Sequence, residues 1–236
     1  MRRLLLAFLR KKLIKLNNVE KFQEVIGYKF KNIEFLNVAL THSSYANEHN
    51  VECNERMEFL GDAVLELAMS EYLYHVIDLD EGVLTKTRAK AVCEVALNVY
   101  AEKIHLANYL LLGKGEEHSG GRERPAIIAD ALEAVLGAVF LDGGFEAASM
   151  IVKNFFIPYI KETLQYKDYK SILQEKLQSE KRSIRYEIVK DLGPANDKTF
   201  EAVVYMDDIL MGRGIGKTKK EAQQNAAKAA LDKEAA

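Results

Sequence analysis

The sequence predicts two domains, an all-α domain followed by a smaller α+β domain with the element order α-β-β-β-α. From residue 19 to about residue 165, apolar residues recur at intervals of three and four, and Pro125 and Pro158 are the only prolines. After Tyr166, short segments alternate apolar and polar residues and end at turn-forming sequences. The 236 residues, 48% of them hydrophobic, are enough for one medium and one small core.

The helical domain is expected over residues 19–145, with a terminal helix and linker over residues 146–167. Runs such as AVLELAMSEYLYHVI and AVCEVALNVYAEKI have helical spacing, and short loops such as LDEGVL separate them. The segment at 129–141 is apolar around almost its whole circumference, apart from Asp130 and Glu133, which predicts a central helix.

The second domain is expected over residues 168–236. A helix at 168–178 precedes three strands, SIRYEIVKD, TFEAVVYMD and ILMGRGIG, and the alanine-rich helix KTKKEAQQNAAKAALDK follows them. Thr218 and Glu221 form a T-x-x-E capping box that predicts the start of this last helix.

Lys217, Lys219 and Lys220 cluster around that helix start, where backbone N–H groups and the helix dipole favour phosphate. A polyanionic partner explains such a lysine trio, and a solvated run of charges is the alternative interpretation.

Charge is unevenly distributed along the chain, although the net charge is only −2. Residues 1–18 contain six basic and no acidic residues, whereas residues 19–166 contain 13 basic and 23 acidic residues. An acidic domain repels a polyanion unless cations are bound to its carboxylates. Metal binding therefore reconciles the acidic middle of the chain with a nucleic-acid substrate.

Residues 1–18 form a basic N-terminal extension rather than a secretory signal. Their longest apolar run, Leu4 to Leu9, is short and no small-residue cleavage site follows it. A flexible extension or short surface helix is one interpretation, and contact with a membrane surface or RNA is the other. No segment is expected to span a membrane. Cys53 and Cys93 lack metal or redox spacing, which predicts a cytoplasmic protein.

Two acidic clusters on separate predicted helices point to a metal site. On a helix advancing about 100° per residue, Glu55, Glu58 and Asp62 fall within an arc of about 60°. Asp130 and Glu133 also share a face. Charges on apolar helices are costly to bury unless they are paired, and a cation is the natural partner. Oxygen ligands alone favour Mg²⁺, with Mn²⁺ as a substitute.

The same residues carry a resemblance. NERMEFLGDAVLEL at 54–67 resembles the signature of the bacterial ribonuclease III family. THSSYA at 41–46, DEGVLTKTRA at 80–89 and SGGRERPAIIADALEAVLGAVFLDGG at 119–144 follow that family's layout. The tail, through GPANDKTF and GKTKKEAQQNAAKAAL, resembles a double-stranded RNA-binding domain.

The resemblance implies a divalent-metal-dependent endoribonuclease. Such an enzyme hydrolyses phosphodiester bonds in double-stranded RNA to leave 5′-phosphate and 3′-hydroxyl ends, in the processing of ribosomal RNA precursors, mRNA and small RNAs. The metal-binding carboxylates implied are Glu58, Asp62, Asp130 and Glu133, of which Asp62 and Glu133 are the catalytic pair. Glu55 and Glu81 match acidic positions nearer the substrate.

The family also implies a homodimer formed through the catalytic domain, and Phe59 of the signature and the apolar helix at 129–141 would support its interface. A non-cleaving double-stranded RNA-binding protein with a nuclease-like dimerisation scaffold is the alternative. A purely structural helical protein is a further alternative, but it needs basic partners that the acidic helices do not supply locally.

A double-stranded RNA-binding domain recognises A-form geometry over about 16 base pairs. The RNA contacts implied here are Gln174, Glu175, Pro194, Asn196, Lys198, Lys217, Lys219 and Lys220. Asn196, Val83 and Thr87 depart from the usual family pattern, which bears on substrate preference. Glu66 is expected to have a surface or supporting role, and His42 and His118 are expected to cap or pack.

Overall fold

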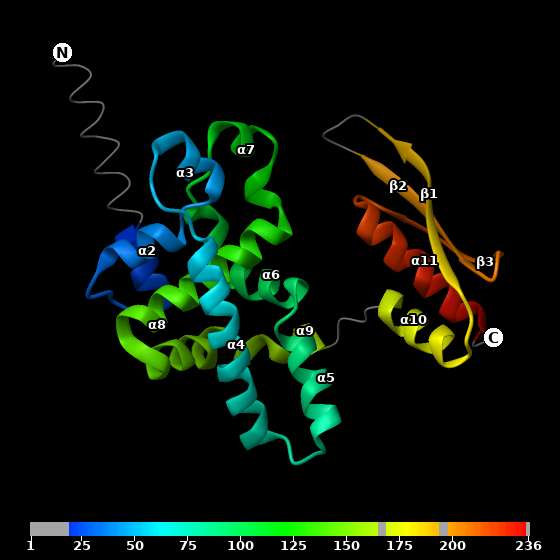
Figure 1. Cartoon of the computed structure of the whole chain (residues 1–236), viewed down its shortest axis with the longest axis horizontal. Helices are drawn as coiled ribbons and strands as arrows, with labels where there is room; N and C mark the ends of the chain where they lie inside the picture. Colours follow the sequence, from blue (N-terminus) through cyan, green and yellow to red (C-terminus); the bar gives the residue numbers. More distant parts are fainter. Residues whose placement is uncertain (1–18, 165–168, 194–197, 235–236) are drawn as a thin grey trace. The chain divides into compact units, whose positions relative to one another are not determined.

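The computed structural model describes residues 19–164, 169–193 and 198–234, and the chain divides into two compact units between residues 165 and 166 (Figure 1). The division falls just before the first helix of the second unit, and the strand-like part of the sequence begins further on, at residue 184. Residues 1–18, Pro194 and Asn196 lie outside the described residues. No helix in the described ranges has both the length and the apolar character needed to cross a membrane.

The first unit is helical. Its first helix covers residues 19–26, and the other elements are α2 (Ile33–Ala39), α3 (Ser43–His49), α4 (Glu55–Val76), α5 (Glu81–Ala91), α6 (Glu94–Lys103), η1 (Leu106–Tyr109), α7 (Lys114–His118), η2 (Gly121–Glu123), α8 (Pro125–Phe155), η3 (Ile157–Tyr159) and α9 (Ile160–Leu164).

Local sequence explains where several of these helices begin. The side chains of Asn32, His42 and Asp80 cap α2, α3 and α5 by accepting backbone N–H groups of the first turn. Pro125 begins α8, where its fixed φ is favourable and its missing N–H costs nothing. The capping role expected of His42 is therefore confirmed.

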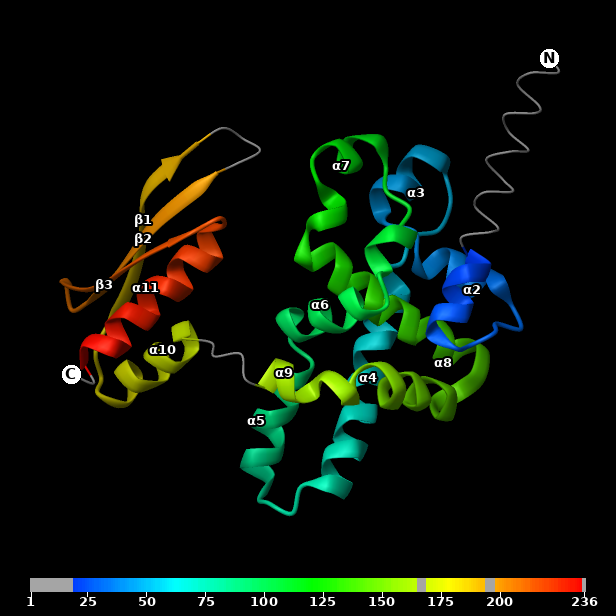
Figure 2. The ribbon, with the colours of Figure 1, turned by 180° about the vertical axis from the view of Figure 1, so that it is seen from behind.

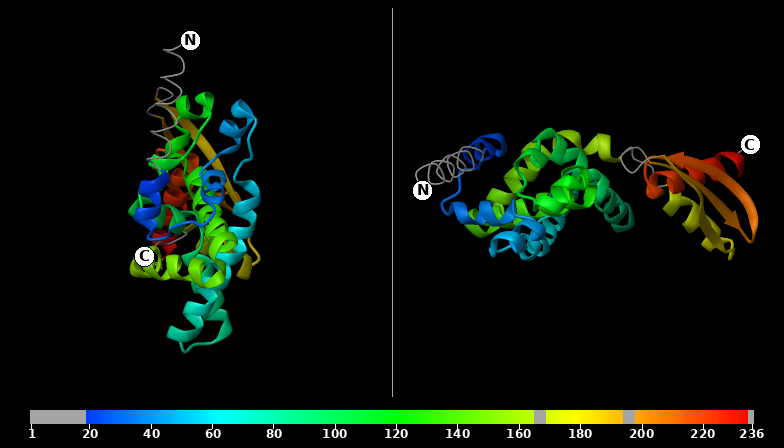
Figure 3. Two further views of the ribbon diagram at one scale, coloured as in Figure 1. Left: turned by 90° about the vertical axis from the view of Figure 1, so that its left-hand side faces the viewer. Right: turned by 90° about the horizontal axis from the view of Figure 1, so that it is seen from above.

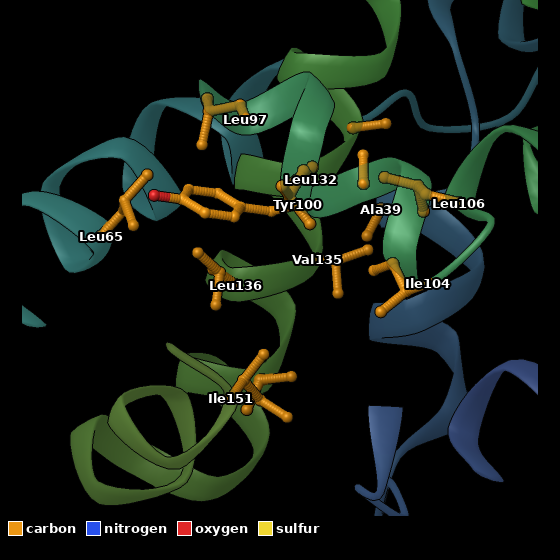
Figure 4. Close-up of a cluster of buried hydrophobic side chains, with 14 of the residues drawn as sticks. Ala39, Leu65, Leu97, Tyr100, Ile104, Leu106, Leu132, Val135, Leu136 and Ile151 are labelled. Carbon is orange, nitrogen blue, oxygen red and sulfur yellow. The ribbon is translucent and has the colours of Figure 1, made fainter. Parts of the chain in front are cut away.

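Helix α8 is the centre of the first unit, as expected for residues 129–141. Leu132, Leu136 and Val139 have no exposed surface, and α8 packs against α4, α6 and α2. Tyr100 of α6 packs with Leu65, Leu132 and Leu136 in one cluster (Figure 4). Because these side chains fill the unit's own core, most of this helix is not available for the dimer interface suggested for it.

Helix α8 bends at Gly144, whose φ of 78° and ψ of −177° are not helical. Just before the bend, the Asp142 carboxylate accepts the Tyr28 hydroxyl at 2.7 Å and the backbone N–H of Lys31 at 2.8 Å. The chain then returns to the core, where Phe156 is fully buried. Residues 146–164, which were expected to form a terminal helix and linker, group with the helical unit.

The second unit has the order α10 (Tyr169–Ser179), β1 (Ile184–Leu192), β2 (Thr199–Met206), β3 (Ile209–Gly216) and α11 (Lys219–Glu234). Its strands form an antiparallel sheet in the order β1-β2-β3. Both helices cover one face of this sheet, and their side chains share a core with β2 (Figures 2 and 3). The predicted fold class of both units is confirmed.

Strand β3 and helix α11 pack backbone against backbone. A Cβ atom on Gly214 would lie 2.1 Å from the Ala226 nitrogen, so the glycines of ILMGRGIG allow this close approach. The Thr218 hydroxyl accepts the Glu221 N–H at 3.1 Å, and the Glu221 carboxylate accepts the Lys217 N–H at 2.7 Å. The expected cap at Thr218 is therefore present.

Candidate active site

Helices α4 and α8 cross at two glycines. A Cβ atom on Gly61 would lie 1.7 Å from the Glu133 carbonyl oxygen, and one on Gly137 would lie 2.3 Å from the Met57 carbonyl oxygen. Only a residue without a side chain permits such backbone contact. The two contacts are equivalent. Gly61 faces Glu133, which lies one turn before Gly137, and Gly137 faces Met57, which lies one turn before Gly61.

This crossing brings the two acidic clusters together. Glu58 and Asp62 flank Gly61 on α4, and Asp130 and Glu133 lie on α8 just before Gly137. Glu55 and Glu58 lie in the first turn of α4, where the helix dipole favours negative charge, whereas the first turn of α8 contains no acidic residue. Asp62 is exposed, whereas Glu58, Asp130 and Glu133 are partly buried.

The carboxylates act on one another electrostatically. Burial and the charges of Asp62, Asp130 and Glu58 raise the pKa of Glu133 to about 8. Burial raises the pKa of Glu58, and the charges of Asp130, Glu55 and Asp62 add to this effect. Burial and Glu94 raise the pKa of Asp130, which the nearby His42 lowers.

A hard divalent cation fits this donor set. Every charged group that acts on the pKa of Glu58 or Glu133 is another carboxylate, so the cluster has an excess of negative charge. Within the described ranges, no three His, Cys, Asp or Glu side chains lie close enough to hold one ion as they stand. Carboxylates repel one another and therefore favour rotamers that keep them apart. A cation bound between them would reverse that preference.

The raised pKa of Glu133 predicts how the metal-free protein responds to pH. An unperturbed glutamate has a pKa of 4.5, so between pH 4.5 and about 8 the unfolded state releases a proton that the folded state retains. This group therefore lowers the free energy of unfolding as pH rises through that window. In EDTA, Glu133→Gln is expected to be more stable than the parent above pH 8, and the two should converge below pH 4.5.

Thermal unfolding of the parent and the variant across this pH range measures the difference, in which the contributions of carboxylates outside the cluster cancel. Glu146→Gln, an exposed change on the same helix, is the control. A parent that gains stability relative to Glu133→Gln as pH rises would contradict the raised pKa. Added Mg²⁺ should stabilise the parent more than the variant.

The other acidic candidates occupy different surroundings. Glu55 begins α4 and acts on the pKa of Glu58, so it lies at the edge of the cluster. Glu81 begins α5 and accepts a hydrogen bond from the Thr85 hydroxyl at 3.1 Å. Glu66, for which a surface or supporting role was expected, forms an ion pair with Arg88 at 2.6 Å that joins α4 to α5.

Sequence reasoning missed Glu94. This residue begins α6, and its charge is the largest electrostatic contribution that raises the pKa of Asp130. The Asn98 amide joins the start of α6 to the start of α8 by donating to the carbonyls of Glu94 at 2.8 Å and Pro125 at 2.9 Å. The only signal in the sequence was an acidic residue near the start of the largely apolar run AVCEVALNVYAEKI.

The described candidate RNA contacts of the second unit are exposed or partly exposed. Gln174 and Glu175 are exposed on α10, and Lys217, Lys219 and Lys220 are exposed at the start of α11. Lys198 forms an ion pair with Asp191 at 3.1 Å, and its ammonium lies 5.7 Å from the centre of the Phe200 ring. The Lys219 ammonium lies 5.9 Å from the same ring. The Phe200 ring therefore lies near both Lys198, just before β2, and Lys219, at the start of α11.

The chain joins a helical unit that has a carboxylate-rich helix crossing to an α-β-β-β-α unit. Together the two units define a class of two-domain proteins that act on nucleic acids. Residues 32–160 match the family model described as Ribonuclease-III-like. Residues 169–234 match the model of the double-stranded RNA binding motif.

Curated relatives match along nearly the whole chain. Ribonuclease 3 of Listeria monocytogenes serovar 1/2a is 47% identical over 225 residues, which cover 92% of this chain and 98% of the relative. Ribonuclease 3 of Onion yellows phytoplasma is 46% identical over 220 residues, covering 92% of each chain. The chain belongs to the ribonuclease III family.

Solved structures of the nuclease domain of ribonuclease III from Campylobacter jejuni are also similar. One is 41% identical with a TM-score of 0.56 and covers 59% of this chain and 96% of that chain. Its description concerns structural flexibility in a region involved in dimer formation. A second is 38% identical with a TM-score of 0.53 and covers 63% of this chain and 97% of that chain.

Proposed function

We propose that this chain is an endoribonuclease that hydrolyses phosphodiester bonds in double-stranded RNA and depends on a divalent metal. The observation that carries this proposal is the crossing of α4 and α8, which gathers Glu58, Asp62, Asp130 and Glu133 in one unit of a chain whose other unit matches an RNA-binding motif. The RNA substrates proposed are precursors of ribosomal RNA, mRNA and small RNAs.

Glu58, Asp62, Asp130 and Glu133 are the residues proposed to hold Mg²⁺, or Mn²⁺ in its place. When bound, the ion lowers the pKa of a water molecule and stabilises negative charge on the departing 3′ oxygen. Asp62 and Glu133 flank the point of closest helix contact, so both are held on rigid backbone. Glu55 and Glu81 are proposed to act around the substrate, and neither needs to contact the ion.

The substrate class is tested with three nucleic acids of one sequence. In Mg²⁺, the paired RNA is expected to be cut, whereas the single-stranded RNA and the DNA duplex are expected to remain intact. The contrast follows from recognition of A-form geometry and 2′-hydroxyl groups by the second unit. Equal cleavage of single-stranded RNA would contradict the proposal.

We also propose that the helical unit forms a homodimer through α4. Exposed apolar side chains recur along one side of this helix: Phe59 is 82% exposed, Leu67 is 56% exposed and Tyr74 is 74% exposed. The exposed Ala63 lies between Phe59 and Leu67, and its small apolar side chain continues the apolar surface along the helix. A twofold interface pairs the same surface of two copies and would set two active sites at a fixed separation.

The dimer is tested by placing a charge on this surface. Phe59→Asp is expected to produce a monomer, because an interface of two identical surfaces would bury the carboxylate twice. The folded state should tolerate the change, since Phe59 is already exposed. Light scattering during gel filtration measures the mass.

Met150→Asp, at a side chain that is 58% exposed on α8, is the control for the dimer test and is expected to leave the mass unchanged. A dimeric mass for Phe59→Asp would mean that the interface does not include Phe59. A monomeric parent would contradict the proposed homodimer.

The second unit is proposed to supply most of the affinity for RNA. Gln174, Glu175 and the loop residues Pro194, Asn196 and Lys198 are proposed to contact the minor grooves. The three lysines at the start of α11 are proposed to contact phosphates between them, where the helix dipole adds to their charge. The proposed compartment is the cytoplasm, where free thiols such as Cys53 and Cys93 are usual.

The lysine contacts predict a change in the salt dependence of binding. Lys217→Gln is expected to weaken binding to duplexes of any sequence by a similar factor and to reduce the slope of log affinity against log salt by about 1. Lys233→Gln, near the other end of α11, should leave the slope unchanged. Titrations in the Glu133→Gln background prevent cleavage. An unchanged slope for Lys217→Gln would mean that this lysine does not contact phosphate.

A further inference from the structure

A cavity of about 490 Å³ lies in the helical unit and shares no lining residue with the acidic crossing. Its lining comes from residue 19, α2, α3, η1, α7, η2 and the segments between them. The wall is mostly apolar and aromatic and includes Val19, Leu40, Tyr45, Tyr109, Leu110 and Leu112. A cavity of this size and character accommodates several apolar side chains.

Several polar groups of the cavity already have partners within the helical unit. The Arg122 guanidinium forms an ion pair with Glu117 at 2.6 Å and donates to the Leu110 carbonyl at 3.1 Å. The Glu48 carboxylate accepts the backbone N–H of Lys114 at 2.7 Å. The rings of Tyr45 and His49 stack with 3.8 Å between their centres. The cavity therefore presents apolar and aromatic surface rather than a charged site for RNA.

The chain itself leads into this cavity. Val19 lines the cavity, is only 7% exposed and is the first described residue, so residue 18 is attached at the cavity wall. The preceding sequence carries Leu9, Leu13 and Leu16 at the i, i+4, i+7 spacing that places side chains on one helical face. It also has six basic and no acidic residues, whereas residues 19–166 have ten more acidic than basic residues.

We propose that residues 1–18 dock on their own helical unit, with leucine side chains in this cavity and basic side chains attracted by the excess of acidic residues in that unit. The tether at Val19 makes docking intramolecular, so its effective concentration is about millimolar and a weak contact is sufficient. A second copy, a lipid surface or duplex RNA are the competing occupants, and the test separates them from the proposal.

The chain has no tryptophan, so Leu13→Trp provides a single fluorescent reporter in the full chain. A peptide of residues 1–18 with the same change gives the emission of the undocked segment. Docking is expected to shift the emission of the full chain to shorter wavelength and to protect it from acrylamide, at every protein concentration tested. Asn108→Arg, at an exposed residue of the cavity lining, should reverse the shift.

Asn47→Arg is the matched control, because it makes the same exchange at an exposed residue of α3 outside the cavity lining. Circular dichroism verifies that both variants fold. Emission equal to that of the peptide would overturn the proposal, as would a shift that survives Asn108→Arg. A shift lost on dilution would assign the cavity to a second copy, and one that needs anionic vesicles or duplex RNA would assign the segment to those partners. Each of these results also overturns the proposal.

Discussion

Glu133→Gln is expected to slow cleavage of duplex RNA by about a thousandfold or more, which corresponds to about 4 kcal/mol of transition-state stabilisation. Glutamine keeps the size of the side chain but removes the negative charge proposed to hold the cation. The position matters because Glu133 lies at the crossing of α4 and α8, where the charges of Asp62, Asp130 and Glu58 all act on it.

Binding of RNA by Glu133→Gln should be as tight as binding by the parent or tighter, because one negative charge near a polyanion is removed. Single-turnover rates and filter binding on the same duplex separate the two effects. Glu146→Gln changes an exposed residue of the same helix and should cleave at the parent rate. Cleavage by Glu133→Gln within tenfold of the parent would mean that the carboxylate has no part in the reaction.

Gly61→Ala is expected to destabilise the helical unit by about 3 kcal/mol or more. Intrinsic helix propensity alone favours alanine over glycine by about 1 kcal/mol. Steric overlap outweighs this gain and lowers the free energy of unfolding. The new Cβ atom would lie 1.7 Å from the Glu133 carbonyl oxygen, 2.5 Å from its carbonyl carbon and 2.9 Å from the Gly137 nitrogen. These are backbone atoms of a buried helix, which cannot move aside as a flexible side chain can.

Urea unfolding followed by circular dichroism measures this loss, and hydrogen exchange in α4 and α8 assigns it to the helical unit. Gly115→Ala is a matched control, because that glycine is also helical and a Cβ atom there meets nothing within 4 Å. Its stability should remain within about 0.5 kcal/mol of the parent or rise slightly. A parent-like stability for Gly61→Ala would show that α4 and α8 do not pack as closely as described.

Local patterns predicted much of the fold and of the candidate site. Helical periodicity was enough to place Glu58 and Asp62 on one face and Asp130 and Glu133 on another, because it depends only on the turn of a single helix. The cap at Thr218 and the order of elements in the second unit were predictable for the same reason. Each depends on residues that are close in sequence.

Tertiary packing determined what the sequence did not reveal. Gly61 and Gly137 are unremarkable in sequence, and only the crossing of two helices explains why neither has a side chain. Glu94 lies on a third helix, so its approach to Asp130 has no local signature. The bend of α8 at Gly144 had no signal in the helical pattern, and after it the chain returns to the same core.

The most direct test of the account is the metal dependence and end chemistry of cleavage on a long, perfectly paired RNA. In Mg²⁺, the chain is expected to shorten this duplex to fragments that accept label from polynucleotide kinase only after phosphatase treatment, which identifies 5′-phosphate ends. EDTA should abolish the reaction. Tight binding of the duplex without cleavage in either Mg²⁺ or Mn²⁺ would contradict the account and leave a duplex-binding protein with a nuclease-like scaffold.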